Sequence, residues 1–200
     1  MNFILFDENR KNLLPFSYTR PISAFRCGIL TLQEKWEKRI PEASFSNLTE
    51  DYLQLKYPVN YDEQKNYYLS ANLLSSDEIV ESIHALMNNE CLVDENQQLL
   101  AIRTDQKLSA DQINSVGFTH KVFKGEAKKI NQVWEIFTGN GNEIQKDFQL
   151  ITKGRESAPI PSNNILIGDQ IFLEEGAKVQ AATLNSTNGP IYLGKDAEIM

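Results

Sequence analysis

The sequence predicts an α/β domain with a mostly parallel β-sheet, followed by the first coils of a parallel β-helix. In the first part, short apolar runs alternate with amphipathic helices at the spacing of right-handed crossovers between parallel strands. In the second part, an aliphatic residue recurs at every sixth position. We expect the α/β domain over residues 1–151, a polar, proline-containing linker over 152–163, and the β-helix over 164–200.

The first strand is predicted over Phe3–Phe6, a continuous apolar run of the kind that is buried on both faces of a sheet. A helix is expected in "TLQEKWEKR", because Thr31 and Glu34 form a capping box and Pro41 follows its end. The same patterns predict a short strand in "ASFSN", a helix in "TEDYLQLKY" and a second buried strand in "YYLSANLL".

The next helix is expected in "SSDEIVESIHALMNN", with Ser75 and Glu78 as its capping box. Its apolar residues form one face; they are Ile79, Val80, Ile83, Leu86 and Met87. Two apolar runs around a polar turn in "CLVDENQQLLAIR" predict a hairpin, and "SADQINSVG" a short helix. One or two helices are expected in "VWEIFTGNGNEIQKDFQLI", and Trp36 and Trp134 are predicted to be core residues. The stretch "KVFKGEAKK" is expected to be a solvated basic face.

The sixfold spacing after residue 163 predicts a coil with three flat sides, whose aliphatic side chains stack inward. Those side chains are Ile167, Leu173, Val179 and, after an insertion of two residues in "NSTNGPIY", Leu193 and Ile199. Ordinary strands with a chance alternation of Ile, Leu and Val are the alternative. Such coils need stacked neighbours, so we expect further coils or another chain to cover this one.

Composition narrows the class of protein. The chain is 41% hydrophobic and 24% charged, with a net charge of −7. No basic surplus is available for phosphates, which argues against a general nucleic-acid or anionic-membrane binder. Cys27 and Cys91 lack metal-ligand spacing and are expected to be free, buried thiols. The apolar run at Phe3–Phe6 is too short for a signal peptide or a membrane span, so we expect a cytoplasmic protein.

The segment "LLPFSYTRPISAFRCGILTLQEKW" carries a family resemblance. Leu13, Pro15, Phe16, Ser17 and Pro21 match, without a gap, the L-x-P-L-T-x-x-x-P skeleton of the sugar-1-phosphate nucleotidyltransferase loop. The chain resembles the sugar nucleotidyltransferase-like branch of that superfamily, which is related to bifunctional N-acetylglucosamine-1-phosphate uridyltransferases. This resemblance implies a Rossmann-like nucleotide-diphospho-sugar transferase fold and a left-handed, hexapeptide-repeat β-helix. It also implies nucleoside triphosphate or nucleotide sugar and sugar phosphate as ligands.

The chemical positions of the loop depart from the family pattern. Glu8 and Arg10 stand where the family has phosphate-binding glycines, and Ile22 stands where it has lysine. Asn72 stands where the resemblance implies an aspartate that holds Mg²⁺, the cofactor expected of an active enzyme. Glutamate adds bulk and like charge against a phosphate, and a neutral amide is a weaker Mg²⁺ ligand than a carboxylate.

Arginines near the loop are candidates to replace the lost contacts, because arginine binds phosphate through two parallel hydrogen bonds. The predicted substrate-binding residues are Arg10, Ser17, Arg20, Arg26 and Asn72. The alternative for the arginines is pairing with nearby acids such as Asp7 and Glu34, and for Asn72 a role in a turn or cap.

Three functions follow. The first is a nucleotidyltransferase with divergent or lost catalytic residues, whose catalytic residues the sequence does not identify. The second is a non-catalytic sugar-nucleotide-binding, regulatory or scaffold module. The third is the N-terminal part of a hexapeptide acyltransferase, although neither histidine of the chain lies in the periodic region. The resemblance adds a homo-oligomer formed through the β-helix.

Overall fold

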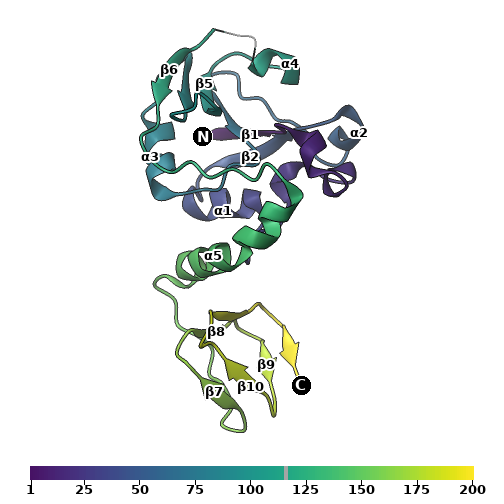
Figure 1. The fold of residues 1–200 in the computed structure, drawn as a ribbon, viewed down its shortest axis with the longest axis vertical. Helices are drawn as coiled ribbons and strands as arrows, with labels where there is room; N and C mark the ends of the chain where they lie inside the picture. Colours follow the sequence, from purple (N-terminus) through teal and green to yellow (C-terminus); the bar gives the residue numbers. More distant parts are fainter. Residues whose placement is uncertain (115–116) are drawn as a thin grey trace. The chain divides into compact units, whose positions relative to one another are not determined.

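The computed structural model describes residues 1–114 and 117–200, which form two compact units (Figure 1). The first unit comprises Met1–Arg26 and Leu30–Ile136, and the second comprises Cys27–Ile29 and Phe137–Met200. None of the helices in the described part of the chain has the length and apolar character needed to cross a bilayer.

A six-stranded sheet forms the centre of the first unit, in the order β2-β1-β3-β5-β4-β6. The strands are β1 (Asn2–Phe6), β2 (Ser44–Leu48), β3 (Asn66–Ser70), β4 (Glu90–Val93), β5 (Leu99–Thr104) and β6 (Thr119–Val122). β1 runs parallel to β2 and β3, β4 runs parallel to β6, and β5 is antiparallel to both of its neighbours. The prediction of an α/β fold with a mostly parallel sheet is confirmed.

The helices are α1 (Leu32–Arg39), α2 (Asp51–Gln54), α3 (Asp77–His84), α4 (Ala110–Ile113) and α5 (Val133–Thr152). The Thr31–Glu34 capping box of α1 is present. The predicted box of α3 is wrong, because its N-cap is Ser76, and Ser75 instead accepts a hydrogen bond from Arg39. Part of the helix expected in "SADQINSVG" lies outside the described residues.

The two faces of the sheet bury different side chains. On one face, Ile4, Phe6 and Tyr68 join a core cluster with Ile113 of α4. Alternation along β1 sends Phe3 and Leu5 to the other face. In the view of Figure 1, α1 and α4 lie on opposite sides of the sheet. The predicted apolar face of α3 is largely confirmed, since Ile79, Ile83 and Leu86 are buried, although Met87 is exposed. Trp36 is also buried, whereas the core prediction for Trp134 is wrong, since this residue is exposed.

The second unit contains three two-stranded parallel sheets, β7 with β10, β8 with β11 and β9 with β12. These strands are β7 (Ile165–Ile167), β8 (Ile171–Leu173), β9 (Lys178–Val179), β10 (Thr183–Asn185), β11 (Ile191–Leu193) and β12 (Glu198–Ile199). Consecutive strands belong to different sheets, and the chain returns to each sheet 18 to 20 residues later. The predicted insertion of two residues accounts for the longer returns.

Leu173, Val179 and Leu184 are buried inside these three sheets, and Leu193 and Ile199 pack against them. The inward position predicted for Ile167 is wrong. Ile167 is 43% exposed and lies beside Asn185, whereas Leu166 aligns with the buried Leu184. On the side formed by β7 and β10, the inward-facing residue therefore lies one position earlier than the hexapeptide spacing predicts.

The segment Cys27–Ile29 is anchored to α5 within the second unit. Gly28 N–H donates to Asn140 Oδ1 at 2.7 Å, and Ile29 N–H donates to Asp147 Oδ2 at 2.9 Å. Gly28 has a φ of +94°, and a Cβ atom there would lie 2.4 Å from Asp147 Oδ2. The positive φ and the lack of room for a Cβ atom both explain a glycine at this position. Cys27 and Cys91 are buried and free, as predicted.

Candidate functional site

The loop after β1 turns sharply without a glycine. Asn9 takes the left-handed conformation, with a φ of 53°, directly before the short 3₁₀ helix η1 (Arg10–Leu13). Asparagine tolerates this conformation better than most residues because its short polar side chain can hydrogen-bond locally. Two further 3₁₀ helices, η2 (Phe16–Tyr18) and η3 (Ile22–Ala24), follow in the same loop. The turn therefore lies between positions 8 and 10, at which the family has glycines.

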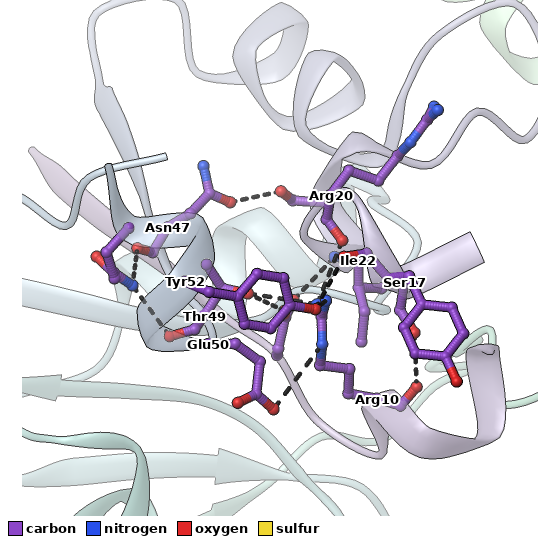
Figure 2. Close-up of polar contacts among 12 residues, drawn as sticks. Arg10, Ser17, Arg20, Ile22, Asn47, Thr49, Glu50 and Tyr52 are labelled. Carbon is purple, nitrogen blue, oxygen red and sulfur yellow. Dashed lines mark hydrogen bonds and ion pairs between the residues drawn. The ribbon is translucent and has the colours of Figure 1, made fainter. Parts of the chain in front are cut away.

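Arg10 lies in a set of contacts that we call the Arg10 cluster, shown in Figure 2. Its members are Asp7, Arg10, Thr49, Glu50 and Tyr52. Nη1 of Arg10 lies 2.7 Å from Asp7 Oδ2 and 3.3 Å from Thr49 Oγ1. Nη2 donates to the Tyr52 hydroxyl at 3.0 Å, and Nε lies 3.9 Å from Glu50 Oε1. With a side chain only 11% exposed, Arg10 is a structural residue of the loop.

Asp7 is the acidic centre of this cluster, and its side chain is 5% exposed. It accepts hydrogen bonds from the Thr49 hydroxyl at 2.5 Å and from the Ile22 N–H at 2.8 Å, besides the bond from Arg10. Burial raises the pKa of the Asp7 carboxyl above its ordinary value, and these three donors lower it by less than burial raises it. Thr49, Ile22 and Arg10 together therefore offset part of the free energy that burial of this carboxylate costs.

Ser17 also has a structural place. Its side chain is fully buried, and its hydroxyl donates to the Arg10 carbonyl at 3.0 Å. This bond ties η2 to η1. The retained family spacing of Ser17 thus preserves the shape of the loop.

Arg20 and Arg26 line one cavity of about 400 Å³, which we call the arginine pocket. Its other lining residues are Pro15, Phe16, Thr19, Phe25 and Ile136. Phe16 is 52% exposed and meets Phe25 edge to face, with ring centroids 6.3 Å apart. A cavity lined by two arginines and an exposed aromatic ring suits a ligand that combines an anionic group with a sugar or an aromatic ring.

The side chains of the two pocket arginines are more exposed than that of Arg10. The Arg20 carbonyl accepts a bond from Arg10 at 3.2 Å, while the Arg20 side chain points away from the Arg10 cluster (Figure 2). Nη2 of Arg26 lies 3.6 Å from Glu34 Oε2, and the Arg26 side chain is 57% exposed. Exposed pairs of this kind contribute about 0–1 kcal/mol. Arg26 can therefore exchange Glu34 for a ligand phosphate at small cost.

Asn72 belongs to a third group of contacts, which we call the Lys129 cluster. Its members are Glu8, Ser70, Asn72, Lys129 and Asn131. Asn72 is fully buried; its Oδ1 accepts from the Ser70 hydroxyl at 2.7 Å, and its Nδ2 donates to Asn131 Oδ1 at 3.1 Å. The Asn72 side chain is thus part of an internal network at the carboxyl end of β3.

Lys129 is fixed beside Asn72 by the backbone. Ile130 N–H donates to the Asn72 carbonyl at 2.9 Å, and Leu73 and Lys129 form an antiparallel bridge. The ammonium Nζ lies 2.6 Å from Glu8 Oε2 and 2.6 Å from the Leu99 carbonyl, and the side chain is 3% exposed. The prediction of a solvated face is therefore wrong for Lys129.

The five predicted site residues fall into three environments: Arg10 and Ser17 stabilise the loop, Arg20 and Arg26 meet in the arginine pocket, and Asn72 lies in the Lys129 cluster. The pairing with acids that was the alternative for the arginines is present at Arg10 and Arg26. Sequence reasoning missed the partnership of Glu8 and Lys129, which are 121 positions apart.

Comparison with known families identifies the fold. The family model described as sugar nucleotidyl transferase matches residues 3–156. The chain belongs to this family. The match covers the first unit, with both the arginine pocket and the Lys129 cluster, and extends through α5. None of the curated proteins matches the chain.

Proposed function

We propose that this member of the sugar nucleotidyl transferase family binds a nucleotide sugar or a sugar phosphate in the arginine pocket. The observation that carries the proposal is the meeting of Arg20 and Arg26 in one cavity with the exposed ring of Phe16. The arginines would bind phosphate oxygens through paired hydrogen bonds, and Phe16 would pack against a base or a sugar ring. Family membership supports a ligand of this class.

The proposed reaction is the one the family description implies. An oxygen of the sugar 1-phosphate would attack the α-phosphorus of a nucleoside triphosphate, and the bond from that phosphorus to the bridging oxygen would break, releasing pyrophosphate. The arginines would stabilise charge on the phosphate oxygens during this displacement.

A second candidate is a binding or regulatory module that keeps the pocket without catalysis. It is supported by the Lys129 cluster, in which the amide of Asn72 is engaged by Ser70 and Asn131. Losing a transition-state contact of the oxyanion-hole kind costs about 3–4 kcal/mol. A chain that lacks such contacts can retain ligand affinity while turnover becomes undetectable.

For the second unit, we propose the start of a left-handed β-helix that associates with another copy of the chain. Support comes from the three parallel sheets and from exposed apolar side chains on β7, at Ile165, Leu166 and Ile167. An acyltransferase reaction would need residues beyond those present, since His84 and His120 lie in the first unit. Size measurement in solution tests the association, and a monomer at all concentrations would contradict it.

Ligand binding is tested by calorimetric titration of UTP, dTTP and their sugar conjugates, with a parallel assay for pyrophosphate release. Arg20→Ala and Arg26→Ala should each weaken binding about tenfold or more, because hydrogen bonds to charged groups contribute about 1.5–3 kcal/mol. Lys11→Ala is the matched control: it removes an exposed cation of the same loop that does not line the pocket. Unchanged affinity in both arginine variants would refute the pocket. Binding without pyrophosphate release would favour the second candidate.

A further inference from the structure

We infer that Lys129 closes the end of β3 to a divalent cation, and that the arginine pocket takes a sugar phosphate or nucleotide sugar in preference to a metal-free nucleoside triphosphate. The ligand part of this inference rests on the proposed function. The metal part rests on the Lys129 cluster alone.

The resemblance to sugar-1-phosphate nucleotidyltransferases places Mg²⁺ beside Asn72, and the donors at that position do not fit this ion. Mg²⁺ requires a near-octahedral set of oxygen ligands at about 2.0–2.1 Å and is usually held by one or two carboxylates. The amide oxygen of Asn72 already accepts the Ser70 hydroxyl at 2.7 Å, and the residue is fully buried. A metal there would bind a neutral amide oxygen that a hydrogen-bond donor already approaches at 2.7 Å.

The carboxylate of the cluster is already neutralised. Oε2 of Glu8 accepts from Lys129 Nζ at 2.6 Å, and it lies 2.7 Å from the Ser70 hydroxyl, whose one hydrogen it shares with Asn72 Oδ1. A cation on the same oxygen would face the ammonium at close range, where like charges repel strongly in a partly buried site. Lys129 cannot easily withdraw, because its Nζ also donates to the Leu99 carbonyl at 2.6 Å and its side chain is 3% exposed.

The two arginines of the pocket indicate which ligand charge the pocket can balance. Among the residues that line the pocket, Arg20 and Arg26 supply the positive charge. A phosphate monoester carries about −1.5 to −2 at neutral pH. Two guanidinium groups therefore balance a sugar phosphate or a nucleotide sugar, whereas a third phosphate group would add charge that they do not offset.

The metal position is tested with Mn²⁺ alone, counted by electron paramagnetic resonance. Wild type and Asn72→Ala should bind the same amount of Mn²⁺, and the double variant Asn72→Asp/Lys129→Met should bind one ion more, because it leaves two carboxylates without an ammonium. A Mn²⁺ ion that wild type binds and Asn72→Ala or Glu8→Gln loses would overturn the inference. A folded double variant that gains no ion would also overturn it. The wild-type comparison decides the matter even where the double variant does not fold.

The ligand is tested by titrating wild type with a uridine diphosphate sugar and with UTP, each in Mg²⁺ and in EDTA. We expect the affinity for the nucleotide sugar to differ by less than about twofold between the two conditions, and to exceed that for UTP in EDTA. A gain of about tenfold or more in the affinity for the nucleotide sugar on adding Mg²⁺, or tighter binding of UTP than of the nucleotide sugar in EDTA, would overturn the inference. Absence of binding to every nucleotide would instead refute the proposed function, and the Mn²⁺ result would still decide the metal position.

Discussion

Replacing Arg10 by alanine is expected to destabilise the first unit, with ligand contacts in the arginine pocket left in place. The substitution removes the guanidinium that lies 2.7 Å from Asp7 and leaves a carboxylate that is 5% exposed. Removing one partner of a buried ion pair typically costs about 3–5 kcal/mol. Asp7 keeps its bonds from Thr49 and Ile22, so we expect the lower end of this range, about 3 kcal/mol.

Urea unfolding followed by tryptophan fluorescence measures this loss. Trp36 is fully buried in the first unit, so its emission changes on unfolding, while the exposed Trp134 adds a nearly constant background. Arg20→Ala is the matched control, since it removes the same side chain from an exposed position of the same loop. The control should change the free energy of unfolding by no more than about 0.5 kcal/mol.

The effect should also depend on pH. The pKa of Asp7 is raised above 3.8 in the folded protein, so its contribution to stability is greatest below that value and falls as pH rises through the folded pKa. Without Arg10 this pKa rises further. The difference between wild type and Arg10→Ala should therefore be largest at neutral pH and shrink toward pH 4. Equal stability of the two proteins at neutral pH, or a difference that grows on acidification, would refute the structural role of the pair.

Three further predictions concern other parts of the chain. Hydrogen bonds from Tyr192 and Arg155 lower the pKa of Glu174 to about 2, so the stability that Glu174 contributes is present above pH 4.5 and lost as pH falls toward 2. The NMR signals of Tyr192 should shift as Glu174 titrates in this range, and Glu174→Gln should abolish the shift. Burial raises the pKa of Tyr68 to about 12, so its contribution is present below 10 and lost as pH rises from 10 toward 12. Absorbance titration should detect the late phenolate in wild type, and Tyr68→Phe should lose about 1–3 kcal/mol, because the carbonyl of Gln106 and the N–H of Leu108 lose their partner. The positive φ of Gly28 alone should cost Gly28→Ala about 1–2 kcal/mol, and the close approach of Asp147 should add to this loss. Gly141→Ala, in an open part of α5, should instead stabilise the chain by about 0.5–1 kcal/mol. Equal shifts of the two melting temperatures would contradict this contrast.

Local chemistry explains which parts of the fold could be predicted from the sequence. The apolar run of β1 and the Thr31–Glu34 cap of α1 are encoded within a few residues, and both are present. The periodicity of the last segment predicts its parallel strands, yet it misplaces Ile167, because the shift of one residue depends on how β7 aligns with β10. Similarly, spacing alone gives no reason why Trp36 is buried and Trp134 is exposed.

The candidate site could be predicted only in part, because its contacts join distant segments. Arg10 and Arg20 are the same residue type in one loop, and what separates them is the arrival of Thr49 and Tyr52 beside Arg10. Lys129 stands in a basic stretch that resembles a solvated surface. Its burial follows from backbone pairing with Leu73 and from a carboxylate 121 positions earlier.

The two acids that follow β1 are both held in ion pairs. Each is neutralised within the first unit, Asp7 by Arg10 and Glu8 by Lys129. A phosphate at the end of β1 would have to compete with carboxylates that hold these cations at 2.7 and 2.6 Å, and breaking either buried pair costs several kcal/mol. The exposed pair of Arg26 with Glu34, at 3.6 Å, is far easier to exchange. From this balance of free energies we expect an anionic ligand to bind in the arginine pocket, with an affinity that depends on Arg20 and Arg26, while Arg10 stabilises the loop.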